Sequence, residues 1–147
     1  MKIEIEENIQ LIYSVMTEPE IWERITDDYS DLSTFTPPDD IYLSGYCDGE
    51  LIGMARFSQV NPHLFEYHPM VFQKYRKKYS VEFHDRTIQT IKKMVSDVQL
   101  IALIPACFRD VYFFARRNGW QLSGKVTQGI KKHNKLQDIN IVQYVEV

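Results

Sequence analysis

The sequence contains few cysteines and no long apolar run. Cys47 and Cys107 are the only cysteines among 147 residues, and neither lies in a CxxC pair or near a histidine at the spacing of metal ligands. We therefore expect two reduced thiols, with neither a disulfide scaffold nor a structural zinc site. The longest apolar stretch, Leu100–Ile104, has five residues, whereas a membrane-spanning helix needs about 20.

The chain also shows no targeting signal, repeat or linker. Its first residues alternate acidic and apolar side chains, where a secretory signal peptide would be basic and then continuously apolar. No Gly/Ser-rich or low-complexity tract interrupts the sequence. We therefore expect a soluble, cytoplasmic protein that forms a single domain over residues 1–147, a length sufficient to bury a core without covalent cross-links.

The charges are unevenly distributed along the chain. Residues 1–50 hold thirteen acidic residues against two basic ones, a net charge of −11, while residues 51–147 carry a net charge of +8. If the two halves lie apart in space, one face would attract a cation or amine and the other a phosphate-bearing ligand. The alternative is two solvated surfaces that bind no ligand.

Hydrophobic periodicity predicts the elements of the first half. Ile3 and Ile5 alternate with charges as in a short edge strand, and apolar residues then recur at helical spacing over 9–16 and 19–25. Residues 27–40 are rich in Asp, Ser, Thr and Pro and are expected to form a loop. From residue 41 the period changes to two, and Asp48-Gly49 predicts a tight hairpin between strands over 41–47 and 51–57.

The second half predicts a crossover connection. A strand over 64–71, a helix over 80–95 and a buried strand over 100–105 form a β-α-β unit whose two strands should be parallel. A helix over 108–117 follows, and Gly119 is expected to end it in the left-handed conformation. Strands over 120–128 and 137–146 close the chain. The predicted order is β-α-α-β-β-β-α-β-α-β-β, an α+β fold with a mixed sheet.

Two segments carry a resemblance to a known family. They are residues 71–81, VFQKYRKKYSV, and residues 114–120, FARRNGW. Together with the element order over nearly the whole chain, they resemble the GNAT superfamily of acetyl-CoA-dependent N-acyltransferases. The first segment stands where the family has its Arg/Gln-x-x-Gly-x-Gly/Ala pyrophosphate loop, and the second where it has Tyr-x-x-x-Gly-Phe. The resemblance implies a GNAT-like mixed sheet.

The resemblance also implies an acetyl-CoA site. In the family, backbone N–H groups at a helix N-terminus bind the pyrophosphate, and glycines let the backbone approach it. Arg76 matches the first motif residue, but Tyr79 and Val81 stand at the two small positions, where the tyrosine ring would occupy the space of the pyrophosphate. The implied cofactor-binding residues are Val71, Arg76, Lys77, Lys78, Tyr79, Ser80 and Val81. The alternative is a basic loop without a ligand, and contact with nucleic acid is not expected because the whole domain is acidic.

Acetyl transfer needs a base for the acceptor amine and a proton donor for the leaving thiolate. The family often uses a tyrosine four residues before the glycine as donor, but Ala115 stands there, which leaves Tyr112, one turn earlier, as the candidate. Glu66 and His68 alternate onto one face of the predicted strand and are the candidate bases. The alternative is structural: Tyr112 as a core aromatic, and the other two as sheet-surface residues paired with neighbours.

Two functions remain open. The degenerate loop resembles GNAT-like proteins of tailed bacteriophages, which implies a non-catalytic interaction or assembly factor located in the host cytoplasm or the virion. Such a factor would bind a protein partner, with Trp22, Tyr29 and Phe35 as candidate contacts. The second function is an N-acetyltransferase whose acidic N-terminal part attracts a cationic amine acceptor. A membrane partner is not expected for either function. For the enzyme, the strands over 64–71 and 100–105 should diverge at one end to admit the cofactor.

Overall fold

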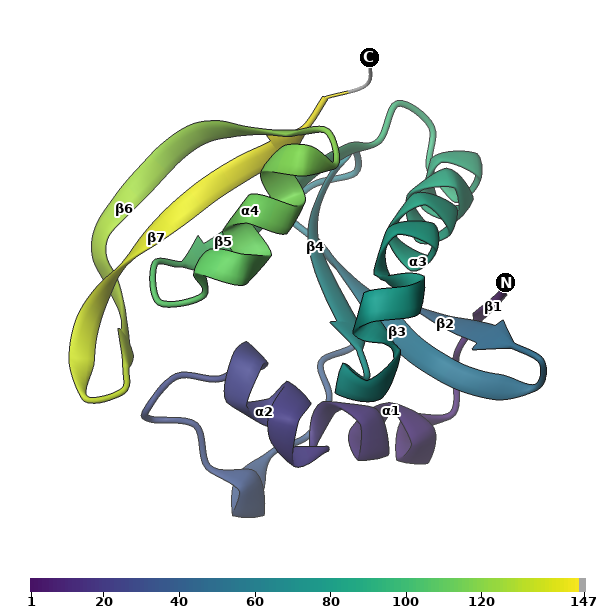
Figure 1. Ribbon diagram of the computed structural model, residues 1–147, viewed down its shortest axis with the longest axis horizontal. Helices are drawn as coiled ribbons and strands as arrows, with labels where there is room; N and C mark the ends of the chain where they lie inside the picture. Colours follow the sequence, from purple (N-terminus) through teal and green to yellow (C-terminus); the bar gives the residue numbers. More distant parts are fainter. Residues whose placement is uncertain (146–147) are drawn as a thin grey trace.

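Strands with period-two patterning assemble into one mixed sheet, and helices pack on it (Figure 1). The computed structural model describes residues 1–145. The strand order is β1-β2-β3-β4-β5-β7-β6. The strands are β1 (Lys2–Ile5), β2 (Ile41–Cys47), β3 (Glu50–Gln59), β4 (Leu64–Val71), β5 (Gln99–Pro105), β6 (Trp120–Lys132) and β7 (Lys135–Tyr144). The helices are α1 (Ile9–Met16), α2 (Pro19–Ile25), α3 (Gln73–Met94) and α4 (Arg109–Arg117), with a short 3-10 turn at Leu32–Thr34.

The predicted order of elements and the parallel crossover are confirmed. β4 and β5 pair in parallel, and the other neighbouring strands pair antiparallel. Only residues 64–66 of β4 pair with residues 99–101 of β5, although β4 continues to Val71 and β5 to Pro105. The two strands therefore diverge toward their carboxyl ends, as the family resemblance implied.

The alternation of side chains along the strands builds a core on each face of the sheet. In β3, Ala55 and Phe57 pack with α3 and α4, whereas Met54 packs with α1 and α2; all three are fully buried. β4 alternates in the same way, with Tyr67 in the first core and Met70 in the second. Even-numbered residues of β4 therefore face α1 and α2.

Helix α3 is longer than predicted. It begins at Gln73, seven residues before the predicted start at residue 80. The segment QKYRKKYS has neither glycine nor proline and consists mainly of residues that tolerate or favour a helix. The prediction of a loop before residue 80 was therefore wrong, because this segment is helical. Strands β6 and β7 extend further toward their common turn than predicted, and residue 146 of the predicted last strand lies outside the described residues.

No helix within residues 1–145 is long and apolar enough to cross a membrane. Gly119 ends α4 with φ +94°, and the predicted left-handed stop is confirmed.

The tight turn between β2 and β3 is also confirmed and gives a test of backbone strain. Asp48 and Gly49 have φ of 51° and 78°, both positive as in a type I′ hairpin turn. A Cβ atom added at Gly49 would meet nothing within 4 Å. Gly49→Val is therefore expected to lower the free energy of unfolding by about 1–2 kcal/mol through left-handed strain alone, measured by urea denaturation. Asp48→Asn is the control, since asparagine tolerates this conformation. Equal stability of the valine variant and the wild type would contradict the prediction.

Candidate functional site

The candidate site lies where β4 and β5 diverge. Because carboxyl ends of parallel strands meet at one edge of a sheet, the helices that follow them begin close together. α3 begins two residues after β4 ends, and α4 begins four residues after β5 ends. The amino-terminal ends of both helices lie at the open end of the divergence, and α2 lies beside them (Figure 1).

Helix α2 is tied to both of these helix ends by ion pairs. Arg76 of α3 donates to both carboxylate oxygens of Glu20 in α2. Arg24, one turn along α2, donates from Nε to Glu20 Oε1 at 2.7 Å and from a terminal nitrogen to Asp110 Oδ2 of α4 at 3.0 Å. The chain Arg76–Glu20–Arg24–Asp110 therefore links α3 to α4 across the open end of the divergence.

The side chain of Asp110 is 65% exposed, and the other three side chains are largely buried. The exposed fractions of the Glu20, Arg24 and Arg76 side chains are 26%, 28% and 25%. Burial opposes the ionisation of Glu20, but hydrogen bonds from Arg76 and Arg24 outweigh it and lower the pKa of its carboxyl group. Burial also opposes the ionisation of Asp110, but Arg24 and the backbone N–H groups of Val111 and Asp110 together outweigh it and lower the pKa of this carboxyl group. The charges at this end of the divergence are thus paired within the protein.

The residues that the resemblance assigned to the cofactor lie in helix rather than in a loop. Lys77, Lys78, Tyr79, Ser80 and Val81 occupy the second and third turns of α3, where backbone N–H groups bond to carbonyls four residues earlier. The side chain of Val81 is 53% exposed. Val71 ends β4 and is buried, and its carbonyl accepts a hydrogen bond from Arg76 Nε at 3.1 Å.

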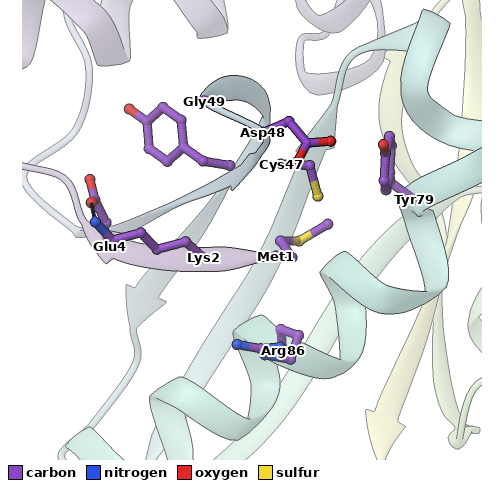
Figure 2. A pocket seen from close by; sticks show the side chains of 9 residues that line it. Met1, Lys2, Glu4, Cys47, Asp48, Gly49, Tyr79 and Arg86 are labelled. Atoms are coloured by element: carbon purple, nitrogen blue, oxygen red, sulfur yellow. Dashed lines mark ion pairs between the residues drawn. The ribbon is translucent and has the colours of Figure 1, made fainter.

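The ring of Tyr79 points to the β1 side of α3. It lines a cavity of about 720 Å³ between β1, the β2–β3 turn and α3 (Figure 2). The lining residues are Met1, Lys2, Glu4, Tyr46, Cys47, Asp48, Gly49, Tyr79 and Arg86. That this ring would occupy the space of a pyrophosphate remains a prediction.

The described residues do not fit acetyl-CoA in the manner of the family. In the family, free backbone N–H groups next to the motif residues bind the pyrophosphate. Here the corresponding N–H groups donate hydrogen bonds within α3. The carboxylate of Glu20 also lies on Arg76, the residue at the first motif position. A phosphate group would meet this negative charge before it reached the arginine.

Glu66 and His68 come together on β4, as the sequence predicted, and face α1 and α2. His68 Nε2 lies 2.9 Å from Glu66 Oε1, and their side chains are 26% and 21% exposed. The bond from His68 lowers the pKa of the Glu66 carboxyl group more than burial raises it. A terminal nitrogen of Arg56 in β3 lies 3.5 Å from His68 Nε2, and Arg56 Nε lies 3.1 Å from Asp40 Oδ2. The carboxylate is therefore a weak base that already has a partner.

Sequence reasoning missed Arg56 and Asp40. Arg56 could have been found, because it is the one charged residue within the predicted strand over 51–57. It lies two residues from Met54 and therefore on the face of the sheet that packs against α1. Asp40 stands at the end of a predicted loop, where nothing in the sequence indicates its partner.

Tyr112 lies on the other side of the sheet from Glu66 and His68. It packs against the core formed with α3 and α4, and its hydroxyl accepts a hydrogen bond from Arg116 at 3.2 Å. It also lines a hollow of about 210 Å³ together with Ala106, Arg109, Phe113 and Asn140. The three candidate catalytic residues therefore do not form one cluster through their side chains.

The acidic and basic stretches of the sequence do not form two separate faces. Glu23 of α2 pairs with Lys132 and His133 at 3.4 and 2.6 Å. The carboxylate of Asp28 accepts hydrogen bonds from the backbone N–H groups of His133 and Asn134 at 3.0 and 2.7 Å. Two acidic residues of the first half are thus bound to the β6–β7 turn of the second half.

Two of the three candidate aromatic contacts pack against each other. The rings of Trp22 and Phe35 meet edge to face with centroids 5.0 Å apart, and Tyr13 lies 6.1 Å from Phe35. Tyr29 is 75% exposed, and Leu32 nearby is 49% exposed. Among the candidates Tyr29 has the most exposed side chain, and its ring is approached by Lys131 Nζ at 5.8 Å.

The model of one protein family matches residues 2–143, and its description is "Protein of unknown function (DUF2824)". The chain belongs to this family. No curated protein matches the chain.

Solved structures show the fold of this DUF2824 protein. The spermidine N-acetyltransferase from Vibrio cholerae, in complex with CoA and spermine, is similar with a TM-score of 0.79 and 10% identity, over 97% of this chain and 93% of that one. The protein smu.2055 from Streptococcus mutans UA159 is similar with a TM-score of 0.74 and 16% identity, over 98% of both chains.

A ribosomal-protein-alanine N-acetyltransferase from Brucella melitensis is similar with a TM-score of 0.71 and 16% identity, over 99% of this chain and 100% of that one. These likenesses confirm the predicted GNAT-like α+β fold. At such low identities they establish the fold and leave the activity to be argued from the site.

Proposed function

We propose that this DUF2824 protein is a non-catalytic GNAT-fold protein that acts by binding another protein. The observation that carries the proposal is the continuous helix from Gln73 through Val81. In this stretch the N–H groups of residues 77–81 are bonded within the helix and cannot bind the phosphates of a cofactor.

Three further features support the absence of acetyl transfer. Ala115 has no hydroxyl group at the position of the family's proton donor. Glu66 is paired with His68, and its lowered pKa makes it a weak base. The carboxylate of Glu20 lies between two arginines at the open end of the β4–β5 divergence.

The finer proposal concerns the partner and the location. The resemblance to GNAT-like proteins of tailed bacteriophages favours a role in particle assembly, in the host cytoplasm or in the virion. The exposed side chains of Tyr29 and Leu32, in the segment after α2, are the proposed protein contacts, because large exposed apolar groups are favoured at interfaces.

A second candidate function is acetyl-CoA-dependent N-acetyl transfer to a cationic amine. The divergence of β4 and β5 favours it, since the family admits its cofactor there, and the similar Vibrio cholerae protein binds CoA and spermine. Glu66 or His68 would then serve as the base and Tyr112 as the proton donor, with Arg76 and the following cations near the cofactor.

Acetyl-CoA decides between the two functions. We expect isothermal calorimetry to detect no binding, and 1 mM acetyl-CoA to leave the melting temperature unchanged. A Kd of about 10 μM would instead stabilise the fold by about 2.7 kcal/mol at that concentration, and such a shift would contradict the proposal. ATP is the control, because a shift common to both ligands reports only attraction of polyanions to surface lysines. In an assay with acetyl-CoA and spermine, free thiol should be released no faster with the protein than without it.

A further inference from the structure

Strand β1 stands at one end of the sheet, so one of its edges is open. The N–H of Glu6, just after β1, donates to the carbonyl of Tyr42 in β2 at 2.8 Å. In an antiparallel pair, residues that bond to the neighbouring strand alternate with residues whose backbone groups point away from it. The N–H and C=O groups of Ile3 and Ile5 therefore point to the open edge, where another strand can pair with them.

The charges of Lys2 and Glu4 favour one partner for this edge. The two side chains lie on the same face of β1, with Lys2 Nζ 2.9 Å from Glu4 Oε1. When a second copy of β1 pairs antiparallel with Ile3 opposite Ile3, Lys2 of each copy lies opposite Glu4 of the other. The next symmetric register centres on Glu4 and would place the two glutamates opposite each other. A second copy of the chain therefore fits the edge in one register, with two complementary charge pairs.

An exposed apolar side chain and a cavity lie at opposite ends of β1. Ile5, at the carboxyl end, is 58% exposed. At the amino end, Met1, Cys47 and Tyr79 help to line the cavity of about 720 Å³ beside α3 (Figure 2). In the register centred on Ile3, Ile5 of each copy lies opposite Met1 of the other, on the face of the sheet that carries α3. The exposed isoleucine would thus enter the cavity of the partner and leave the water.

We propose that this protein forms a symmetric dimer in which the β1 strands of two copies pair antiparallel and join the two sheets into one. Each copy offers the same edge, as a twofold axis requires. The backbone groups of Ile3 and Ile5, the Lys2–Glu4 charges and the cavity are all used in this pairing. The proposal goes beyond the proposed function, because it concerns the association of the chain with itself and depends neither on acetyl-CoA nor on another protein.

Charge reversal tests the register. Sedimentation equilibrium from micromolar to millimolar protein measures the dimer dissociation constant. Lys2→Glu and Glu4→Lys should each raise it at least about tenfold, because two attractive pairs become repulsive. An equimolar mixture of the two variants should form the dimer again, since every glutamate then lies opposite a lysine. A wild type that is monomeric at millimolar concentration, or a mixture that stays monomeric, overturns the proposal.

A matched pair of variants tests the role of the cavity. Ile5→Ser removes the apolar side chain that would enter the partner, and we expect the dissociation constant to rise at least about tenfold. Val60→Ser is the control, because Val60 is also 58% exposed but lies in the turn between β3 and β4. Its dissociation constant should equal that of the wild type. Equal effects of the two serines would show that Ile5 does not lie in the interface and would overturn the proposal.

Amide hydrogen exchange of the wild type tests the pairing without any substitution. The N–H groups of Ile3 and Ile5 should exchange more slowly as the protein concentration rises, because only the dimer provides acceptors for them. The N–H of Glu4 points to β2 in both states and should change much less. Exchange rates of Ile3 and Ile5 that do not depend on concentration overturn the proposal. This outcome is independent of the acetyl-CoA titration, which tests only the proposed function.

Discussion

Replacing Trp120 with alanine is expected to lower the free energy of unfolding by about 3–5 kcal/mol, the loss typical of a large buried aromatic residue. The side chain is only 3% exposed and stacks on Tyr67, with centroids 5.7 Å apart and planes at 17°. Its Nε1–H donates to His84 Nε2 at 2.8 Å. Alanine would leave a cavity between the sheet and α3 and would also leave the buried imidazole without its donor.

The two contributions can be separated. Trp120→Phe keeps most of the ring and loses the N–H, so its cost should be nearer to the about 1–3 kcal/mol of an unsatisfied buried acceptor. Trp22→Ala is the matched control, since Trp22 is half-buried and its ring contact with Phe35 lies at the edge of the second core. Far-UV circular dichroism in urea measures all three variants. A loss for Trp120→Ala no larger than for Trp22→Ala would contradict the prediction.

The strands and the crossover could be predicted because their signals are local. The period of two over 41–47, the Asp48-Gly49 pair and the apolar run Leu100–Ile104 each indicate an element within a few residues. The closeness of Glu66 and His68 follows from the same period of two, because residues two apart in a strand share a face.

The start of α3 was predicted wrongly because the apolar stripe that indicates the helix begins only at Val81, whereas the helix itself begins at Gln73. A pyrophosphate loop needs glycines at two positions, and this chain has Tyr79 and Val81 there. Without a glycine or proline between residues 72 and 81, nothing interrupts the helix, and it extends back to Gln73. The missing glycines indicate a helix in place of the loop rather than a loop with bulky side chains.

The ion-pair chain at the candidate site could not be predicted from the sequence. Arg24 and Glu20 are four residues apart on one helix, a spacing that the sequence shows. The contacts that matter for the site join residues 56 and 86 positions apart, Glu20 with Arg76 and Arg24 with Asp110. They depend on where α2 packs beside the divergence, which no local pattern indicates.

Gly53 is the position at which the geometry of β3 controls the end of β4. It pairs with Val71, the last residue of β4. A Cβ atom at Gly53 would lie 2.6 Å from the carbonyl oxygen of Met70 and 2.8 Å from the Cα of Val71. Both are backbone atoms that cannot rotate away. Gly53→Ala must therefore push the two strands apart, and we expect a loss of about 1–3 kcal/mol in the free energy of unfolding.

Gly124→Ala is the matched control for Gly53→Ala. Gly124 is also a strand glycine, in β6, but its added Cβ would meet only Ile141 Cδ1 at an ordinary 3.7 Å. The free energy of unfolding of the Gly124→Ala variant should stay unchanged or rise slightly, because alanine leaves the unfolded chain fewer conformations than glycine does. Equal losses of stability for the two alanines in urea denaturation would show that the contact between β3 and β4 is not the cause.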